Sequence, residues 1–66
     1  MQLKINGELK EVNDACSVYQ LTQQLDLADK RIAVEINGEI VPRSLFHEKI
    51  LTANDCIEIV QAIGGG

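Results

Sequence analysis

Aromatic and catalytic side chains are scarce in this chain. Its 66 residues include no Trp and only one Tyr, one Phe and one His. His47 has no neighbour in the sequence that would orient or activate it, so we expect a solvated side chain rather than a base or a ligand. A chain of this length buries only about 60% of its unfolded surface on folding, which leaves no room for a deep cleft. We therefore expect no catalytic residues in the chain itself.

Cysteine is also scarce, and its spacing does not match a metal or redox site. Cys16 and Cys56 form neither a CxxC pair nor a zinc-ligand cluster. We expect no disulfide between them in a reducing cytosol, and we interpret both as small, buried or half-buried apolar residues. No bound metal or cofactor is expected.

Long hydrophobic runs and large basic clusters are absent. No segment approaches the length needed to cross a bilayer, and the first residues read as a strand rather than a signal peptide, so we expect a cytoplasmic protein with no membrane partner. Ten acidic against six basic residues give a net charge of -4, and no basic cluster is longer than Lys30-Arg31. This charge argues against nucleic acid and favours a protein partner with a basic docking face.

The rest of the sequence is typical of one globular domain, which we assign to residues 1–66. Apolar residues make up 45% of the chain and charged residues 24%, the balance of a chain that folds. The first strand ends at Asn6-Gly7, a two-residue hairpin signal because both residues accept positive φ. In the second strand, predicted at 8–12, Leu9 and Val12 have opposite parity and cannot both face the core. Either a bulge near the turn or an exposed Leu9 would resolve this conflict.

One amphipathic helix is predicted after this hairpin. The run from Ser17 to Gln20 matches the capping box, in which the two side chains satisfy backbone donors reciprocally. Four residues then follow the spacing i, i+3, i+4, i+7: Val18, Leu21, Thr22 and Leu25. A short helix with a single apolar stripe must pack on a sheet.

The second half of the sequence alternates between short strands and turns. Apolar residues alternate over 32–36 into a second Asn-Gly turn, and Pro42 keeps the next strand short. An irregular or 3₁₀ turn is predicted at 44–49, before Asn54-Asp55 leads into a closing strand at 56–60. The core is expected to be closed by four apolar residues of this region: Leu45, Phe46, Ile50 and Leu51. The elements indicate an α+β fold, a small mixed sheet with the helix and loops on one face.

Two charged residues of this region are given structural roles. Asp55 is expected to stabilise its turn through its side chain rather than to touch a ligand. Arg43 could pair with a partner carboxylate or with its own Glu39 or Glu48, and we favour the pairing within the chain.

The glycine-rich end is the most informative feature of the sequence. Gly64, Gly65 and Gly66 come shortly after the closing strand, and glycine loses the most backbone freedom on ordering while packing nothing. Three in a row make a thin thread ending in a carboxylate, which an enzyme could draw through a narrow channel. A frayed or added terminus is the alternative. We place the flexible tail at about 61–66.

The residues just before the glycines are candidates for partner docking. If Ile57 and Ile59 face the core, strand alternation places Cys56, Glu58 and Val60 outside. Val60 is then an exposed aliphatic, and Ile63 is easier to explain by partner contact than by folding. We predict that Val60, Ile63 and Glu58 recognise the partner, with Glu58 supplying charge.

Several segments spread over the whole length match one known family. They are the start Met1–Gly7, the helix start Ser17-Val18, the run Asn37–Arg43, the pair Asn54-Asp55 and the glycine end. On these segments the chain resembles the ThiS family, the ubiquitin-like β-grasp sulfur carriers of thiamine biosynthesis. The Asn-Gly-Glu-x-Val-Pro-Arg run is the distinguishing piece. Two positions depart from the family pattern: Asn54 stands where Gly is common, and Gly64 is an extra glycine.

The resemblance implies that Gly66 carries the reacting carbon and that Gly65 and Gly64 let it enter a partner's site. A carboxyl with a pKa of about 3.5 is an anion that nucleophiles do not attack. In the family an E1-like adenylyltransferase (ThiF type) therefore uses ATP to form an acyl-adenylate. Sulfur from a persulfide enzyme replaces AMP, and a thiazole synthase (ThiG type) receives it from the thiocarboxylate. The chain is then a carrier, not an enzyme.

Two other functions remain open at this point. A sulfur carrier of another pathway, such as molybdopterin synthesis, would use the same tail with a different synthase. A ubiquitin-like modifier or plain binding module would form an isopeptide bond through the tail or use only its surface. A lysine-linked adduct would support modification, whereas a terminal thiocarboxylate would support either carrier.

Overall fold

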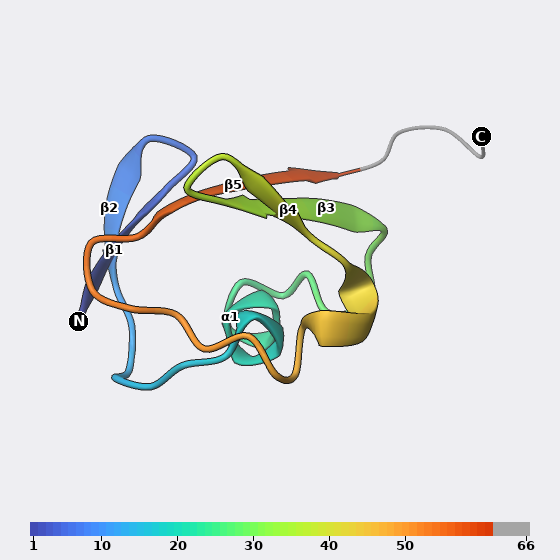
Figure 1. Ribbon diagram of the computed structural model, residues 1–66, viewed down its shortest axis with the longest axis horizontal. Coiled ribbons are helices and arrows are strands. Elements are labelled where there is room, and N and C mark those ends of the chain that lie inside the picture. Colours follow the sequence, from blue (N-terminus) through green and yellow to red (C-terminus); the bar gives the residue numbers. More distant parts are fainter. Residues whose placement is uncertain (62–66) are drawn as a thin grey trace.

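The computed structural model describes residues 1–61, and they form a five-stranded mixed sheet with one helix across one face (Figure 1). In chain order the elements are β1 Gln2–Ile5, β2 Glu8–Glu11, α1 Val18–Gln24, β3 Ile32–Ile36, β4 Glu39–Val41, the 3₁₀ helix Arg43–Leu45 and β5 Cys56–Gln61. The strand order across the sheet is β2-β1-β5-β3-β4. The last strand is therefore central, parallel to β1 and antiparallel to β3. The predicted α+β fold is confirmed.

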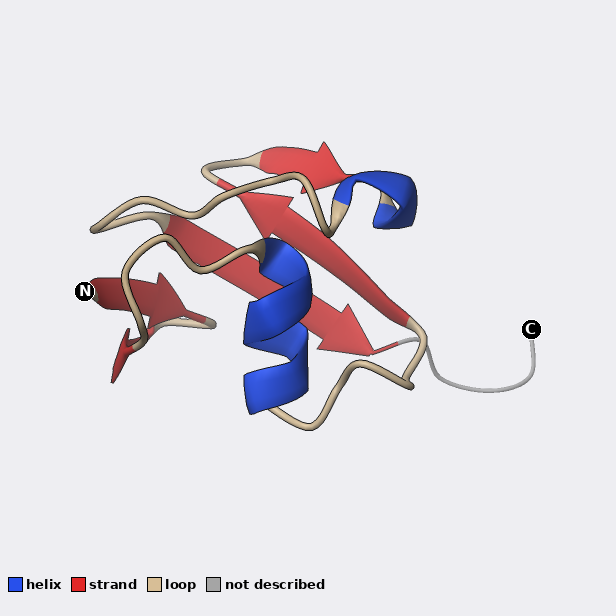
Figure 2. Ribbon diagram, turned by 90° about the horizontal axis from the view of Figure 1, so that it is seen from below, coloured by secondary structure: helices blue, strands red, loops and turns tan. Residues whose placement is uncertain are grey.

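The hydrophobic core lies between the sheet and α1, which crosses in front of the strands in Figure 2. The buried apolar residues are Leu3, Ile5, Val12, Cys16, Val18, Leu21, Val34, Ile36, Phe46, Leu51, Ile57 and Ile59. Phe46 and Leu51 are buried as predicted, but Leu45 and Ile50 are 44% and 48% exposed. Ile50 forms an antiparallel bridge with Ser17, and alternation in this extended stretch turns Leu51 inward and Ile50 outward.

The helix begins with the predicted capping box. The Gln20 amide donates to the Ser17 hydroxyl at 3.1 Å, and the Ser17 amide donates to Gln20 Oε1 at 2.9 Å. These two bonds satisfy donors that the helix itself leaves unpaired. Val18, Leu21 and Thr22 are buried, and the Thr22 hydroxyl donates to the Tyr19 carbonyl at 2.7 Å. Burying this threonine on the apolar stripe therefore leaves no polar atom unpaired.

The first hairpin settles the facing of Leu9 and Val12. Every residue of β2 is exposed, and Leu9 is 68% exposed on the face opposite α1. Val12 lies one residue beyond β2, where its amide donates to the Met1 carbonyl at 2.9 Å and its side chain is buried. The parity conflict between Leu9 and Val12 is therefore resolved by exposure of Leu9 rather than by a bulge at the turn.

The asparagines of the two Asn-Gly turns hold the central strand from both sides. Asn6 and Asn37 have φ of 50° and 52°, as the hairpin signal predicts. Asn6 also donates from Nδ2 to the Ile59 carbonyl at 3.1 Å and accepts from the Ile59 amide at 2.8 Å. Asn37 accepts from the Cys56 amide at 3.0 Å. Both turns therefore fix β5, the strand that leads to the C-terminal residues.

Asp55 stabilises the turn before β5, as predicted. Its carboxylate accepts from the Thr52 amide at 2.9 Å, from the Thr52 hydroxyl at 3.0 Å and from Asn37 Nδ2 at 3.0 Å. Desolvation acts to raise the pKa of Asp55, but these hydrogen bonds and the charge of Lys49 outweigh it and lower the pKa from its usual 3.8. The folded state therefore favours the ionised carboxylate.

A lowered pKa makes the contribution of Asp55 depend on pH in one direction. Its stabilisation is present above the ordinary carboxyl pKa of 3.8 and is lost as pH falls through the lower folded-state pKa. Asp55→Asn should therefore lower the melting temperature at pH of about 6 and have a smaller effect near pH of about 3. Thermal unfolding of both proteins across this range measures the difference. A difference that stays constant with pH would contradict the assignment.

The two cysteines occupy different environments. Both are free; Cys16 is buried beside the start of α1, and its Sγ donates to the Ser17 carbonyl at 3.3 Å. Burial raises the pKa of the Cys16 thiol. Cys56 is exposed, so its interpretation as a buried or half-buried residue was wrong. The reason is strand alternation, because Ile57 and Ile59 face the core and Cys56 has the opposite parity.

This difference predicts separable effects of replacing each cysteine. Cys16→Ala should lower the free energy of unfolding by about 1–2 kcal/mol, whereas Cys56→Ser should change it by less than about 0.5 kcal/mol. A thiol reagent should modify Cys56 in the folded protein and Cys16 only after denaturation. Urea titration and mass spectrometry after brief labelling measure both effects. Rapid labelling of Cys16 in the folded state would show that it is not packed.

Candidate functional site

The predicted reactive end lies outside the described residues. Gly66, Gly65, Gly64 and Ile63 all follow residue 61, so their roles stay predictions. Gln61, which we placed at the start of the tail, belongs to β5 and pairs with Ile32 of β3. The sheet therefore fixes the chain up to its last described residue.

The outer face of β5 carries the predicted docking residues. Ile57 and Ile59 are 1% and 7% exposed, and Glu58 and Val60 lie on the opposite face. Val60 is 61% exposed, which confirms its predicted position, while its role in docking stays a prediction. Figure 2 shows α1 on one face of the sheet, and Glu58 and Val60 lie on the other face of β5.

Val60 lies in a shallow groove that the sequence alone did not indicate. Ala33 of β3 is directly opposite Val60, and the groove, with a volume of about 250 Å³, is lined by Arg31, Ile32, Ala33, Arg43 and Val60. Strand alternation placed Val60 outside, but only the pairing of β3 with β5 shows which side chains surround it. The exposed aliphatic residue therefore has a basic rim.

Glu58 faces a second carboxylate. The register of β3 and β5 places half-buried Glu35 directly opposite exposed Glu58. Like charges in this position repel each other, and a cation from a partner would relieve the repulsion. Ile40, directly opposite Glu35 on β4, is 70% exposed and adds an aliphatic residue beside this pair. Glu35 and Ile40 are candidate docking residues that sequence reasoning missed.

Arg43 interacts within the chain, although not with the predicted glutamates. Its Nη2 donates to the Lys30 carbonyl at 2.8 Å, and its guanidinium lies 5.5 Å from the ring centre of Phe46. The prediction of Glu39 or Glu48 as its partner was therefore wrong. The Arg43 side chain reaches back from the 3₁₀ helix to the loop before β3, whereas sequence distance favoured nearby carboxylates. These contacts place Arg43 beside Lys30 at the end of the sheet where β5 ends.

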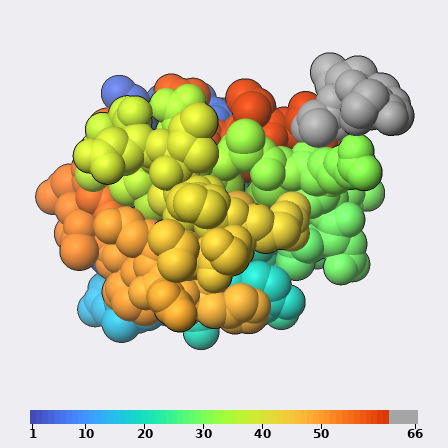
Figure 3. Space-filling model, turned by 45° about the vertical axis from the view of Figure 1, so that its right-hand side comes forward, coloured from blue at the N-terminus to red at the C-terminus, as the bar shows by residue number. Residues whose placement is uncertain are grey.

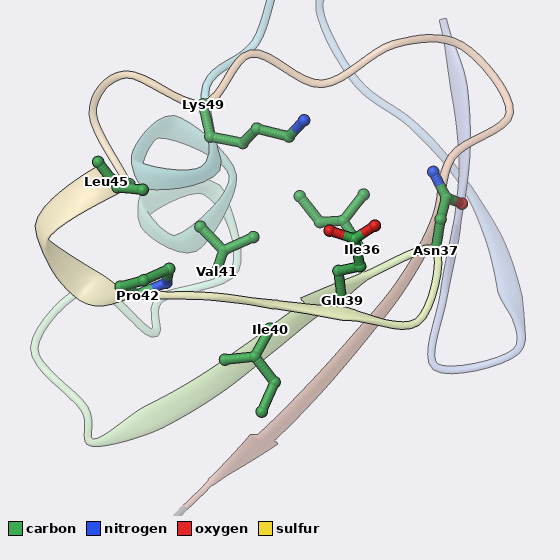
Figure 4. Close-up of a pocket in the computed structure, with 8 residues that line it drawn as sticks. All are labelled: Ile36, Asn37, Glu39, Ile40, Val41, Pro42, Leu45 and Lys49. Atoms are coloured by element: carbon green, nitrogen blue, oxygen red, sulfur yellow. The ribbon is translucent and has the colours of Figure 1, made fainter.

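A second groove runs along β4 and is shown in Figure 4. Its volume is about 280 Å³, and it is lined by Ile36, Asn37, Glu39, Ile40, Val41, Pro42, Leu45 and Lys49. In Figure 4, Val41 points toward the side of Leu45 and Lys49, while Ile40 points away from it. Among these lining residues, the charged groups are the Glu39 carboxylate and the Lys49 ammonium.

The only histidine of the chain, His47, lies beside an aromatic ring. The exposed ring of His47 stacks on Tyr19 with 4.0 Å between ring centres. Within this part of the chain, no group of three or more His, Cys, Asp or Glu side chains could hold a metal ion. Nor is any helix among these residues long and apolar enough to cross a membrane.

A mixed sheet of this strand order with one helix across it defines the ubiquitin-like β-grasp class. The crystal structure of the thiamine biosynthesis protein ThiS from Geobacter metallireducens has the same fold, with a TM-score of 0.84 and 32% sequence identity over 100% of both chains. The model of the ThiS family matches residues 3–66. The chain therefore belongs to the ThiS family.

Two relatives place this domain in different contexts. The sulfur carrier protein ThiS of Bacillus subtilis is 37% identical over 65 residues, which covers 97% of this chain and 98% of the relative. A thiazole synthase from Paramagnetospirillum magneticum is 39% identical over 66 residues, which covers all of this chain but only 20% of the relative. The same domain thus occurs both alone and within a much longer polypeptide.

Proposed function

We propose that this chain carries sulfur for thiamine biosynthesis as a thiocarboxylate on Gly66. The observation that carries the proposal is the match to the ThiS family over residues 3–66, which includes the terminal glycines. Sulfur carrier proteins of the same family are 37% and 33% identical over nearly all of this chain. The domain is the part that a partner recognises, and Gly66 is the part on which the partner acts.

The chemistry at Gly66 requires activation because its carboxylate resists nucleophiles. An E1-like adenylyltransferase transfers AMP from ATP to a carboxylate oxygen and releases pyrophosphate. A persulfide sulfur then attacks the acyl carbon, and the bond from carbon to the AMP oxygen breaks. Reductive cleavage of the acyl disulfide by a thiol leaves the thiocarboxylate. The partner enzymes supply ATP, sulfur and catalysis, so the chain needs no cofactor or catalytic residue of its own.

The glycines before Gly66 suit this role because they have no side chains. Gly65 and Gly64 allow the reacting carbon to enter a narrow site, and β5 holds the point from which the chain continues. Asn6 and Asn37 fix that strand from its two neighbours through the Ile59 and Cys56 amides. We assign the carrier to the cytoplasm, where its partner enzymes would work.

A thiazole synthase is the proposed recipient of the sulfur. The support is that thiazole synthases of two bacteria contain a segment 39% and 33% identical to this whole chain, spanning 20% of each protein. In those proteins the similar segment is part of one longer polypeptide. For the present domain, we propose that recognition of the synthase occurs through its surface. The similar carriers are named as ThiS, which favours the thiamine pathway over a molybdopterin-type carrier or a protein modifier.

The docking prediction rests on the outer face of β5. Val60→Asp should weaken binding to the adenylyltransferase by about tenfold to a hundredfold, because a buried aliphatic contact contributes about 1.5–3 kcal/mol. Ile63→Asp should act in the same direction. Glu58→Gln should mainly alter the association rate and its salt dependence. Calorimetric titration of each folded variant against the enzyme measures these effects, and unchanged affinity of both aspartate variants would move docking to another face.

Genetic complementation tests the pathway. In a bacterium that lacks its own ThiS, this chain should restore growth without thiamine, and the same chain without Gly66 should not. A matched strain that lacks its molybdopterin carrier should not recover molybdenum-dependent nitrate respiration. Rescue of the second strain but not the first would replace the thiamine pathway with the molybdopterin pathway.

A further inference from the structure

We propose that the sheet end at Arg43 and Val60 docks an acidic segment of the enzyme that takes up the tail. The segment would place an aspartate or glutamate on Arg43 and an adjacent aliphatic side chain on Val60. This inference rests on the proposed function, because it needs an enzyme that binds the tail. It proposes an acidic partner segment at this place, whereas the net charge of -4 indicates a basic partner.

Charge is distributed unevenly over the molecule. Three of its six basic residues, Lys30, Arg31 and Arg43, come together where β3 starts and β5 ends. Asp29, next to Lys30 in the sequence, is the acidic residue nearest to them along the chain. In Figure 3 the green surface of the β3 segment adjoins the red surface of β5 and the yellow-orange surface after β4. An acidic protein therefore has a locally basic end.

Arg43 is held in position before any partner binds. One Nη2 donor is used on the Lys30 carbonyl at 2.8 Å, and the guanidinium lies over the ring of Phe46, which is only 3% exposed. Its backbone begins the 3₁₀ helix directly after Pro42. A guanidinium has five N–H donors in a rigid fork, so donors remain for a carboxylate. Because the side chain is already ordered, binding costs less conformational entropy.

The groove beside Arg43 supplies the apolar half of the site. Ala33 and Val60 lie opposite each other on β3 and β5, and the groove of about 250 Å³ has room for an aliphatic side chain. Two residues before Val60, Glu58 faces Glu35 and makes the same strand face acidic. A partner segment that places an acidic side chain on Arg43 and a basic side chain near Glu58 therefore fits in one orientation only. Complementary charge in this order would fix the register in which the tail is presented.

A charge reversal tests the site with a matched control. Arg43→Glu should weaken binding to a bacterial ThiF-type adenylyltransferase by at least about tenfold at low salt, with a smaller effect at high salt. Lys10→Glu makes the same change of charge on β2, at the far side of the sheet from Arg43, and should change affinity by less than about twofold. The affinity of Arg43→Lys should lie between those of the wild type and Arg43→Glu, because lysine keeps the positive charge but lacks the forked N–H donors of the guanidinium.

The outcomes separate this site from the proposed function. Suppose that the wild-type protein is adenylated and that the Arg43→Glu and Lys10→Glu variants bind the enzyme with equal affinity. This result would overturn the acidic docking segment and leave the carrier function intact. Wild-type protein that is neither bound nor adenylated would overturn the proposed function itself. If Arg43→Glu lowers the melting temperature, the affinity of Arg43→Met is measured instead, because methionine keeps apolar contact with Phe46 and removes the charge. Wild-type affinity in that variant would contradict the proposal.

Discussion

Removing Gly65 and Gly66 should abolish sulfur loading and leave the fold intact. The truncated chain ends in the carboxylate of Gly64, two residues short of the Gly66 carboxylate that the proposed enzyme activates, so adenylate formation should fall to background. Every core residue of the described structure lies between Leu3 and Ile59, so thermal unfolding should shift little. ATP-dependent pyrophosphate exchange with the adenylyltransferase and a melting curve measure the two properties separately.

A deletion of Gly64 alone is the matched control for this truncation. It shortens the chain by one residue and keeps the terminal pair Gly65-Gly66. We expect slower adenylation rather than none, because the reacting group is present but its reach is reduced. Full activity of the double deletion would show that the reacting carbon is elsewhere. A large loss of stability in the double deletion would show that the glycines contribute to the fold.

Asn6→Ala should be among the most destabilising replacements outside the apolar core. It removes both hydrogen bonds to Ile59 and forces alanine to adopt a φ of 50°. Two lost bonds of about 1 kcal/mol each and a left-handed backbone costing about 1–2 kcal/mol suggest a total of about 3–4 kcal/mol. That is a large part of the stability of about 5–15 kcal/mol typical of small domains.

Asn6→Gly separates the two causes. Glycine accepts positive φ, so this variant loses the hydrogen bonds without the backbone penalty and should be destabilised by about 2 kcal/mol. Urea unfolding of wild type and both variants provides the comparison. Equal stability of Asn6→Ala and wild type would mean that the side chain does not anchor β5.

Local patterns predicted the elements of this fold well. The capping box at Ser17, the Asn-Gly turns and the alternation in β5 depend on residues within a few positions of each other, and each is confirmed. The same alternation placed Val60 outside. Short-range geometry determines these features, so one sequence is sufficient to infer them.

Contacts between distant segments could not be predicted in the same way. Asn6 bonds Ile59 across 53 positions, and Arg43 bonds the Lys30 carbonyl rather than a nearby glutamate. The hairpin signal of Asn6-Gly7 gave no indication that its side chain would hold another strand. Strand order decides such contacts, and order follows from the packing of the whole domain.

The same limit applies to the candidate site. Sequence parity identified Glu58 and Val60, but their neighbours Glu35 and Ala33 became evident only from the register of β3 with β5. The net charge predicted a basic partner, yet the residues around Val60 include Arg31 and Arg43. Global composition describes the average surface, whereas recognition depends on the local one.

The intact mass of the chain isolated from its native cell, under conditions that preserve thiocarboxylates, tests the central claim most directly. We expect a fraction of molecules heavier by the difference between one sulfur and one oxygen atom, with the added mass located at Gly66 by fragmentation. That fraction should disappear in cells lacking the adenylyltransferase. A chain that carries only an unmodified carboxylate in cells making thiamine, or one joined through Gly66 to a lysine, would contradict the carrier function.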